Sequence, residues 1–371
     1  MKTKGIYVVS NIDKALAFEW IASEINKNKF ELKFILLNPG SSVLANFLQN
    51  VKIPVYALKY NGKKDLPATL FKIYKILKKE KPAFIHTHLF DASLIGLTAG
   101  KLAGVRKRII TRHHGNQHHV YFPRAVRYDK WISALATAIV APSASVKDIL
   151  VNLEQVNPDK VKIIHHGFNL SYFKGENQAL VSRLKEKYNP NNQWPVLGVI
   201  SRYTELKGLQ FVIPAFKKIL KLYPDALLIL ANATGDYKAQ VQEILKEIDN
   251  RNYTEITFEP NVAALYRLFQ VFVHVPITAS SEAFGQTYVE ALAAGIPSVF
   301  TLSGVAKEFI RHEENAYVVP FRDADAIYAG MLELIQNKEL ADHLTSQGRQ
   351  DVDEQFNLRV MIGALEDLYE Q

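Results

Sequence analysis

Two glutamates and two cations have the spacing and sequence context to bind a ligand that carries both phosphate and hydroxyl groups. Glu282 and Glu290 lie eight residues apart, on either side of Gly285. Ionised carboxylates accept hydrogen bonds from neighbouring hydroxyls such as those of a sugar or a ribose. Arg202 and Lys207 follow a predicted strand, where open α/β sheets bind ligands. Two cations at that place can neutralise a pyrophosphate without a metal ion.

The segment after Gly285 is expected to form a helix whose first turn binds an anion. Apolar residues recur at helical spacing after this glycine, and Gly295 is positioned to end the helix. A helix N-terminus has free backbone N–H groups, here near Gln286 and Thr287, which suit a pyrophosphate. Glu290 would then lie about one helical turn inside.

The elements that position these residues are predicted to be βα units in two domains. The length of 371 residues exceeds what one hydrophobic core usually serves. Short apolar runs alternate with longer amphipathic ones, which indicates parallel sheets covered by helices. Strands are expected at 5–9, 32–37, 83–86, 108–111, 138–141, 196–201, 227–231, 272–275 and 298–301. The stretch 177–195 reads as a charged helix that ends in the turn-rich residues 189–192, which suits a domain junction. We therefore expect domains at 1–176 and 177–355, followed by a final helix at 356–371.

The composition is that of a globular protein, with 48% hydrophobic and 22% charged residues. Cysteine is absent, which excludes disulfides, thiolate metal sites and a cysteine nucleophile. The apolar run at 5–9 is too short for a signal peptide core or a membrane span. We therefore expect a cytoplasmic protein, and the inner face of the cell membrane is one place where it could act.

The positive charge is concentrated in the first half of the chain. Residues 1–175 contain 27 Lys and Arg against 11 Asp and Glu, although the net charge of the whole chain is only +8. The predicted helix at 66–81 carries five lysines beside an apolar stripe. Its basic face is either solvated or docks on anionic lipid headgroups. No recognised nucleic-acid motif accompanies the basic half, so nucleic acid is not an expected partner.

Several segments resemble the motifs of the retaining family-4 glycosyltransferases, which have the GT-B fold. The glutamate pair is similar to the E-x7-E signature of that family, and the resemblance extends over nearly the whole chain. The other segments are Ser201–Gly208, similar to G-R-x-x-x-x-K-G with serine in place of the usual first glycine; His166–Asn169 with Phe173; and, more weakly, Ile85–His88 and Thr111–His113.

The resemblance implies an α/β fold of two Rossmann-like domains facing each other across a cleft. The C-terminal domain would bind a nucleotide-sugar donor, the N-terminal domain would lie on the acceptor side, and the helix at 356–371 would pack back on the N-terminal domain. The implied activity is transfer of a sugar to a glycan or lipid-linked acceptor hydroxyl with retention of configuration, in cell-surface polysaccharide or glycolipid synthesis. Neither a metal nor any other cofactor is expected.

The family's functional residues carry over to matching positions of this chain. The expected catalytic residues are His113, Arg202, Lys207 and Glu282, with His114 as the alternative to His113. Glu282 would hold the donor sugar, Glu290 the ribose, and the two cations the pyrophosphate. The other expected donor-binding residues are Ala283, Phe284, Gly285, Gln286 and Thr287, with a base pocket at Pro260, Asn261 and Val262. The loop at 9–14 lacks the Gly-Gly turn of many relatives, which leaves its contact with the donor phosphate open.

Three other patterns have competing interpretations. Asp323 and Asp325, and likewise Asp351 and Asp353, have D-x-D spacing, but we interpret both pairs as acids at helix starts rather than as metal ligands. Histidines 113, 114, 118 and 119 have spacing that could suit zinc, and residues 118–127 could instead form an acceptor-binding loop through His118, His119, Tyr121, Arg124 and Arg127. A nucleotide-sugar 2-epimerase on the same architecture is the alternative function.

Overall fold

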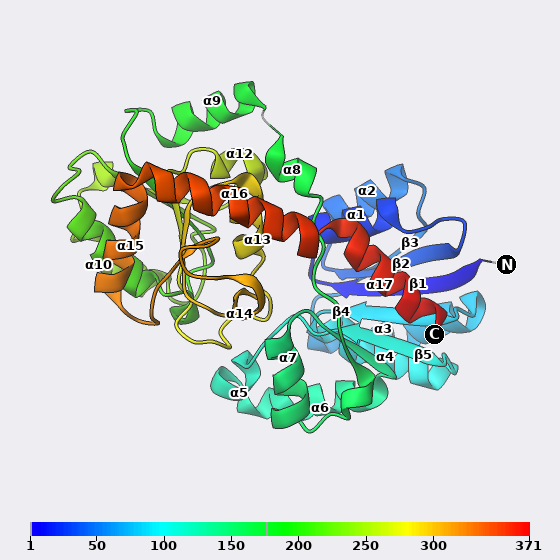
Figure 1. The fold of residues 1–371 in the computed structure, drawn as a ribbon. Helices are drawn as coiled ribbons and strands as arrows, with labels where there is room; N and C mark the ends of the chain where they lie inside the picture. Colours follow the sequence, from blue (N-terminus) through cyan, green and yellow to red (C-terminus); the bar gives the residue numbers. More distant parts are fainter. Residues whose placement is uncertain (1, 176) are drawn as a thin grey trace. The chain divides into compact units, whose positions relative to one another are not determined.

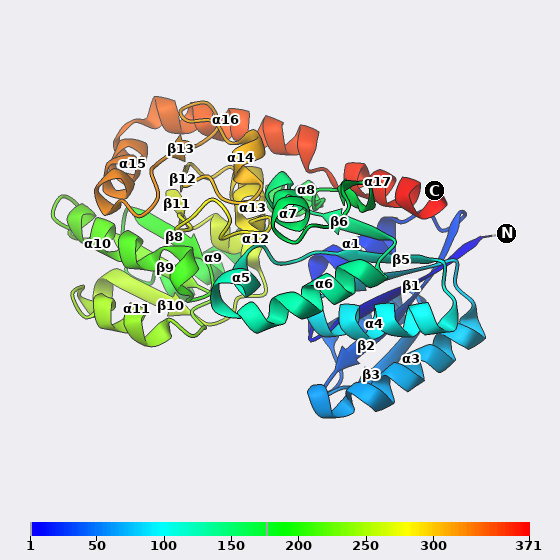
Figure 2. The same cartoon turned by 90° about the horizontal axis from the view of Figure 1, so that it is seen from below.

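A computed structural model describes residues 2–175 and 177–371 as two compact α/β units. The first unit contains the residues up to Phe168 together with Leu358–Gln371, and the second contains Asn169–Asn357. Figures 1 and 2 show the ribbon in two views. Each unit is built on a parallel sheet, so the prediction of two Rossmann-like α/β domains is confirmed.

The strands of the first unit are β1 (Thr3–Ser10), β2 (Phe30–Asn38), β3 (Val55–Lys59), β4 (Phe84–His88), β5 (Lys107–Thr111), β6 (Ala138–Ala141) and β7 (Val161–Ile163). The strands of the second unit are β8 (Val196–Ile200), β9 (Leu227–Ala231), β10 (Tyr253–Ile256), β11 (Val271–His274), β12 (Ser298–Phe300) and β13 (Tyr317–Val318).

The helices of the first unit are α1 (Leu16–Glu24), α2 (Val43–Asn50), α3 (Leu66–Glu80), α4 (Phe90–Ala103), α5 (Gln117–Tyr121), α6 (Val126–Leu135), α7 (Ala144–Asp148) and α17 (Leu358–Glu370). Those of the second unit are α8 (Leu170–Lys174), α9 (Gln178–Tyr188), α10 (Leu209–Ile219), α11 (Lys238–Leu245), α12 (Val262–Tyr266), α13 (Gln286–Ala294), α14 (Ala306–Phe309), α15 (Ala324–Gln336) and α16 (Lys338–Gln355).

Both sheets are parallel and reverse their strand order at one point. The first has the order β3-β2-β1-β4-β5-β6-β7 and the second β10-β9-β8-β11-β12-β13. The order therefore changes direction between β1 and β4, and between β8 and β11. Ligands of open α/β sheets bind outside the carboxyl ends of the strands at such switch points. The segments that follow these four strands are thus the places to look for a site.

Apolar side chains from both faces of each sheet form the cores. In the first unit, α1, α2 and the C-terminal helix α17 cover one face (Figure 1). Helix α17 contributes Met361, Leu365 and Tyr369 to the core. In the second unit, α10 and α15 pack side by side over β8, β9 and β11. Strands such as β8 are buried along their whole length, which explains why their sequences are continuous apolar runs.

The boundary between the units lies earlier in the chain than the expected junction. Helix α8 follows the boundary and packs on the second unit, where buried Phe173 contacts Tyr266 edge to face and its carbonyl accepts a hydrogen bond from Arg267. The segment after Phe168 therefore belongs to the second unit. Residue 176, the expected end of the N-terminal domain, lies outside the described residues.

Gly208, between Lys207 and α10, allows a test of how tightly the segment after β8 is held against β11. Gly208 has φ +78°, and a Cβ there would lie 2.0 Å from the backbone oxygen of Val275. Gly104 has nearly the same φ, +80°, but a Cβ there would meet nothing within 4 Å.

We expect Gly104→Ala to reduce the free energy of unfolding by about 1 to 2 kcal/mol, the cost of a left-handed alanine. Gly208→Ala should cost several kcal/mol more, because backbone must move. Denaturant unfolding of the two variants measures the difference, and equal losses would contradict this packing.

Candidate active site

Glu282 lies beside two cationic or protonatable side chains at the carboxyl ends of β8 and β11. Lys207 Nζ is 2.5 Å from Glu282 Oε1, and His274 Nε2 is 3.1 Å from the same oxygen. Lys207 ends the short turn after β8, and His274 is the last residue of β11. These two strands flank the switch point of the second sheet. The three residues therefore converge where an open α/β sheet binds its ligand.

Charge pairing keeps the Glu282 carboxylate ionised although it is buried. Burial opposes the charged form, but Lys207 and His274 outweigh it and lower the pKa of Glu282 to about 2. Burial lowers the pKa of His274, so its imidazole is neutral near pH 7. Glu282 is thus an ionised acceptor at any ordinary pH. His274 was not among the expected site residues, although a polar residue at the end of the apolar run 271–275 was a usable signal.

The turn between Glu282 and α13 has the geometry that the sequence predicted. Gly285 takes a left-handed conformation with φ 91° immediately before α13, and Gly295 ends the helix with φ 72°. A hydroxyl of Ser303 accepts a hydrogen bond from the Glu282 backbone N–H at 3.0 Å. The first N–H groups of α13, from Gln286 and Thr287, follow this turn directly. The glutamate and a helix N-terminus therefore occupy one short segment.

Glu290 differs from Glu282 in its ionisation. It lies within α13, and Tyr266 donates a hydrogen bond to its Oε2 at 3.0 Å. Burial raises the pKa of Glu290 to about 7, and the bond from Tyr266 only partly offsets this. Among the described residues, no salt bridge pairs Glu290 with a cation, whereas Glu282 is paired with Lys207.

The remaining donor-binding candidates lie in neighbouring loops of the second unit. Arg202 follows β8, is exposed, and has no salt bridge to another described residue. Phe284 is buried in the turn before α13, whereas Ala283 is only partly buried. Pro260, Asn261 and Val262 follow β10 and lead into α12, where Glu259 accepts hydrogen bonds from the backbone and side chain of Asn261.

A histidine array occupies the carboxyl ends of β4 and β5 in the first unit. His88 Nδ1 is 3.0 Å from His113 Nε2, and the rings of His113 and His166 stack at 5.6 Å. The second histidine of β4, His86, bonds to Tyr369 of α17 and to Thr111. Burial lowers the pKa of His113, His88 and His166, so these imidazoles are neutral near pH 7. His88 was predicted only as part of a cleft-facing element, but it is the direct partner of His113.

His114 lies apart from this array. Its Nε2 is 3.3 Å from Asp129, and burial lowers its pKa to about 4. His118 and His119 also lie against buried carboxylates, those of Asp129 and Glu154. Of the residues expected in an acceptor-binding loop, the two histidines are thus partly buried, whereas Tyr121, Arg124 and Arg127 are exposed.

The D-x-D pairs have structural partners. Asp323 caps α15 by accepting from two backbone N–H groups, as predicted for an acid at a helix start. For Asp351 and Asp353 that prediction is wrong, since both lie near the C-terminal end of α16. Asp351 is buried against Asn315, whereas Asp353 pairs with Lys174. Residues two apart on a helix point in different directions, so this pair does not converge.

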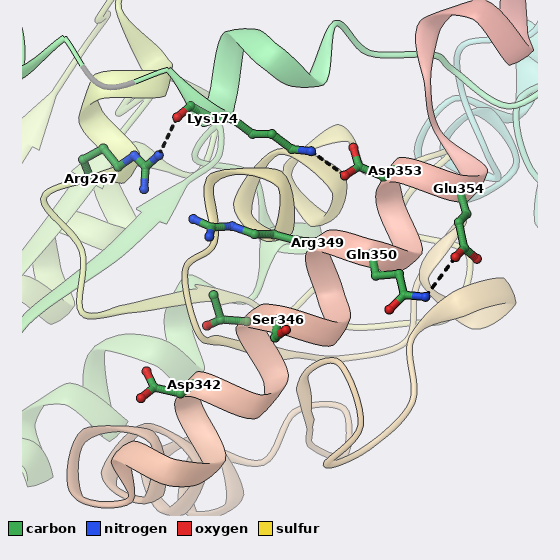
Figure 3. Close-up of a pocket in the computed structure, with 9 residues that line it drawn as sticks. Lys174, Arg267, Asp342, Ser346, Arg349, Gln350, Asp353 and Glu354 are labelled. Carbon is green, nitrogen blue, oxygen red and sulfur yellow. Dashed lines mark hydrogen bonds and ion pairs between the residues drawn. The ribbon is translucent and has the colours of Figure 1, made fainter.

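A polar pocket in the second unit contains none of the expected donor residues. It has a volume of about 770 Å³, and helix α16 supplies most of its lining (Figure 3). Lys174 pairs with Asp353 there, and Arg267 donates to the Lys174 carbonyl. The charges of the lining residues balance, so this pocket has no evident preference for an anionic ligand. The lining residues are Lys174, Arg267, Asp342, Thr345, Ser346, Arg349, Gln350, Asp353 and Glu354.

Comparison with known proteins connects both units to one class. Residues 21–172 match the family described as "Glycosyltransferase Family 4", and residues 181–351 match "Glycosyl transferases group 1". The chain is 23% identical over 332 residues to the N-acetyl-alpha-D-glucosaminyl L-malate synthase of Bacillus anthracis, with 87% of this chain and 83% of the relative covered.

Two further relatives have similar coverage. The capsular polysaccharide biosynthesis glycosyltransferase CapM of Staphylococcus aureus is 26% identical over 81% of this chain and 80% of its own. The UDP-Gal:alpha-D-GlcNAc-diphosphoundecaprenol alpha-1,3-galactosyltransferase of Escherichia coli is 22% identical over 95% of this chain and 91% of its own.

Solved structures show the same fold. HepE of Anabaena, crystallised with UDP and glucose, superimposes with a TM-score of 0.83 at 16% identity, covering 99% of both chains. A Listeria monocytogenes protein described as a UDP-N-acetylglucosamine 2-epimerase has a TM-score of 0.67 at 14% identity, covering 99% of this chain and 95% of its own. The fold and the family matches together define a glycosyltransferase of the GT-B type. Both units thus match glycosyltransferase families, the first unit family 4 and the second unit group 1.

The raised pKa of Glu290 predicts a pH-dependent penalty on folding. The folded protein keeps this proton up to about pH 7, whereas an unfolded chain loses it near pH 4.5, the ordinary value. Protonated Glu290 therefore contributes its full share to the free energy of unfolding below pH 4.5, and that contribution is lost as the pH rises through 7. As the pH rises from 4.5 to 8, the free energy of unfolding of Glu290→Gln should increase by on the order of 2 kcal/mol relative to that of wild type, after allowance for partial exposure of the side chain. Denaturant unfolding measures this, with exposed Glu186→Gln as control. Parallel pH curves for Glu290→Gln and wild type would show that Glu290 has no raised pKa.

Proposed function

We propose that the protein transfers a sugar from a nucleotide-sugar donor to an acceptor hydroxyl with retention of anomeric configuration. The observation that carries this proposal is the buried, ionised Glu282 beside Lys207 and the N-terminus of α13. An anionic acceptor, a cation and free N–H groups in one place suit a ligand that combines sugar hydroxyls with a pyrophosphate.

Each donor group has a candidate partner in the second unit. Glu282 accepts hydrogen bonds from the sugar hydroxyls, and the backbone amides of 283–287 contact the sugar and the pyrophosphate. Lys207 and Arg202 neutralise the pyrophosphate, and Lys207 does so while still in contact with Glu282. Glu290 holds the ribose, and hydroxyl donors there would favour its ionised form. Residues 260–262 lie against the base. No divalent ion takes part in this arrangement.

In the transfer step, the bond between the anomeric carbon and the phosphate oxygen breaks, and a bond to the acceptor oxygen forms on the same face. The acceptor proton passes to the departing phosphate, so no enzyme nucleophile is needed. His113, held neutral by burial, contributes a hydrogen bond near the anomeric centre. Retention is supported by two relatives whose names describe α-linked products. Positioning and electrostatic stabilisation then account for most of the catalysis.

The acceptor is proposed to be a glycan or lipid-linked saccharide in cell-surface polysaccharide or glycolipid synthesis. One relative is named for capsular polysaccharide biosynthesis and another for a diphosphoundecaprenol-linked acceptor. A third is named for L-malate, so the names of the relatives differ in acceptor. The donor sugar and its base are accordingly open to experiment.

An assay of nucleotide release distinguishes transfer from epimerisation. The protein is freed of Mg²⁺ and Mn²⁺ and incubated with UDP, GDP and ADP sugars, with and without diphosphoundecaprenol-linked saccharides. We expect acceptor-dependent release of one nucleoside diphosphate and no increase when Mg²⁺ or Mn²⁺ is added. Lys207→Ala should lower turnover roughly 10- to 150-fold, the value of one charge-assisted contact of 1.5 to 3 kcal/mol. Lys246→Ala, which removes an exposed lysine, is the control.

Three results would contradict the proposal. An isomerised donor without nucleotide release would indicate the 2-epimerase. Dependence on Mg²⁺ or Mn²⁺ would reopen the metal interpretation of the D-x-D pairs. Equal turnover of Lys207→Ala and wild type would remove Lys207 from the site.

We also propose that the first unit contacts anionic membranes through residues 120–131. Among the described residues, no helix is long and apolar enough to span a membrane. Helix α3 presents exposed lysines, but most of its apolar stripe is turned inward, as shown by buried Ile73 and Leu77. The segment 120–131 instead exposes Val120, Tyr121, Phe122, Tyr128 and Trp131 beside Arg124, Arg127 and Lys130. Aromatic and basic side chains together suit the interface of an anionic bilayer.

Vesicle binding compares these two surfaces. We expect the protein to sediment with vesicles containing phosphatidylglycerol more than with pure phosphatidylcholine. The double variant Phe122→Ala, Trp131→Ala should weaken that binding on the order of 10-fold, because two interfacial aromatic rings are lost. Phe71→Ala removes an equally exposed ring from α3 and should have little effect. If Phe71→Ala weakened vesicle binding and the double variant did not, the contact would be assigned to α3. Unchanged vesicle binding of the double variant would exclude the 120–131 surface.

A further inference from the structure

Three side chains outside the donor site converge on one point in the first unit. His114 Nε2 is 3.3 Å from Asp129 Oδ1, and His118 Nδ1 is 2.6 Å from Asp129 Oδ2. One ligand atom from each residue lies within 4.8 Å of the others. His114 follows β5, His118 is in α5 and Asp129 is in α6, so three successive elements supply the cluster.

The two oxygens of Asp129 differ in their surroundings. Arg112 NH2 lies 3.3 Å from Oδ2, the oxygen that also contacts His118. The other oxygen, Oδ1, is fully buried, and His114 Nε2 faces it at 3.3 Å. At that separation the two atoms make at most a weak hydrogen bond with each other. Because buried polar atoms are nearly always well satisfied, both retain the capacity to bind a shared partner.

The charges of the cluster point to a cation. Asp129 and Glu154 are both buried, and Arg112 contacts both of them. One guanidinium thus faces two buried carboxylates, and an unpaired buried charge is costly. A proton on one of the neighbouring histidines would also supply the missing charge, and on His114 it would strengthen the 3.3 Å contact between Nε2 and Asp129 Oδ1. A metal ion would both supply charge and bind these two atoms.

The space beside these atoms is small. A cavity of about 10 Å³ is lined by His114, Asp129 and Arg112, by the polar side chains of Ser93, Thr111 and His113, and by apolar side chains that include Leu89 and Ile132, whereas His118 does not line it. That volume is about what one water-sized occupant needs. Two imidazole nitrogens and one carboxylate oxygen are the usual ligands of zinc-class ions, and they leave one coordination position open.

We propose that His114, His118 and Asp129 bind a divalent transition-metal ion of the zinc class. Arg112, which is itself paired with Glu154, holds the Asp129 carboxylate in place, as second-layer partners do in metal sites. The ion would tie the segment after β5, which begins with His113, to α5 and α6. This site lies in the first unit and takes no part in binding the donor pyrophosphate.

Metal binding to the full chain tests the proposal. The protein is stripped with a chelator, dialysed, and titrated with Zn²⁺ alone in the absence of any nucleotide sugar. We expect one Zn²⁺ per chain, and visible d–d absorption when Co²⁺ is used instead. His118→Gln should weaken Zn²⁺ binding by about 100-fold or more, since loss of a second-layer partner already costs 10- to 100-fold. His119→Gln is the matched control, because His119 contacts Glu154 rather than Asp129.

The outcomes separate the alternatives. Wild type without stoichiometric Zn²⁺ binding would overturn the proposal and favour a protonated histidine or a water molecule at the cluster. Equal loss in His118→Gln and His119→Gln would also overturn it, because it would indicate nonspecific histidine binding. Circular dichroism confirms that both variants are folded. Since binding is measured without a donor, either outcome leaves the proposed transferase activity untouched.

Discussion

The ion pair between Lys207 and Glu282 is the interaction on which the second unit's site depends. A buried carboxylate is costly unless it is paired, and Lys207 and His274 together keep this one charged. The pair requires the segment after β8 to lie against the end of β11, which is the packing that places Gly208 on the Val275 carbonyl. It also fixes the turn at 282–285, and thereby the start of α13. One electrostatic contact thus connects the sheet, the turn and the helix N-terminus.

The two glutamates of the E-x7-E pair share a segment but not an environment. Glu282 faces a lysine and is ionised, whereas Glu290 faces the hydroxyl of Tyr266 and has a pKa of about 7. In the ligand-free protein, Glu282 is therefore ready to accept hydrogen bonds, while Glu290 exchanges its proton near neutral pH. If a ribose binds there, the donor must promote this ionisation. Donor binding is then linked to proton release at Glu290 and is independent of protonation at Glu282.

Much of this could be predicted from the sequence, because the buried strands are continuous apolar runs and Gly285 and Gly295 mark the ends of α13. The expected strands omitted β3, β7, β10 and β13, which are short and less buried. The position of α8 depends on the burial of Phe173 against Tyr266. The environment of Asp351 depends on Asn315, which is distant from it in sequence. The sequence likewise could not reveal that His274 and Lys207 meet at one oxygen, or that His114 lies apart from His113.

The central claim is that Glu282 contacts the donor's sugar and Lys207 its pyrophosphate. The most direct test is calorimetric titration of wild type and Glu282→Gln with one nucleoside diphosphate and with the corresponding nucleotide sugar, chosen from the UDP, GDP and ADP series by thermal stabilisation. We predict that Glu282→Gln weakens binding of the nucleotide sugar on the order of 10- to 100-fold, as expected for loss of charged hydrogen bonds. Binding of the free diphosphate should be unchanged or tighter, because Lys207 is released from its partner. If Glu282→Gln weakened binding of the nucleotide sugar and of the free diphosphate equally, or weakened neither, the account would be contradicted.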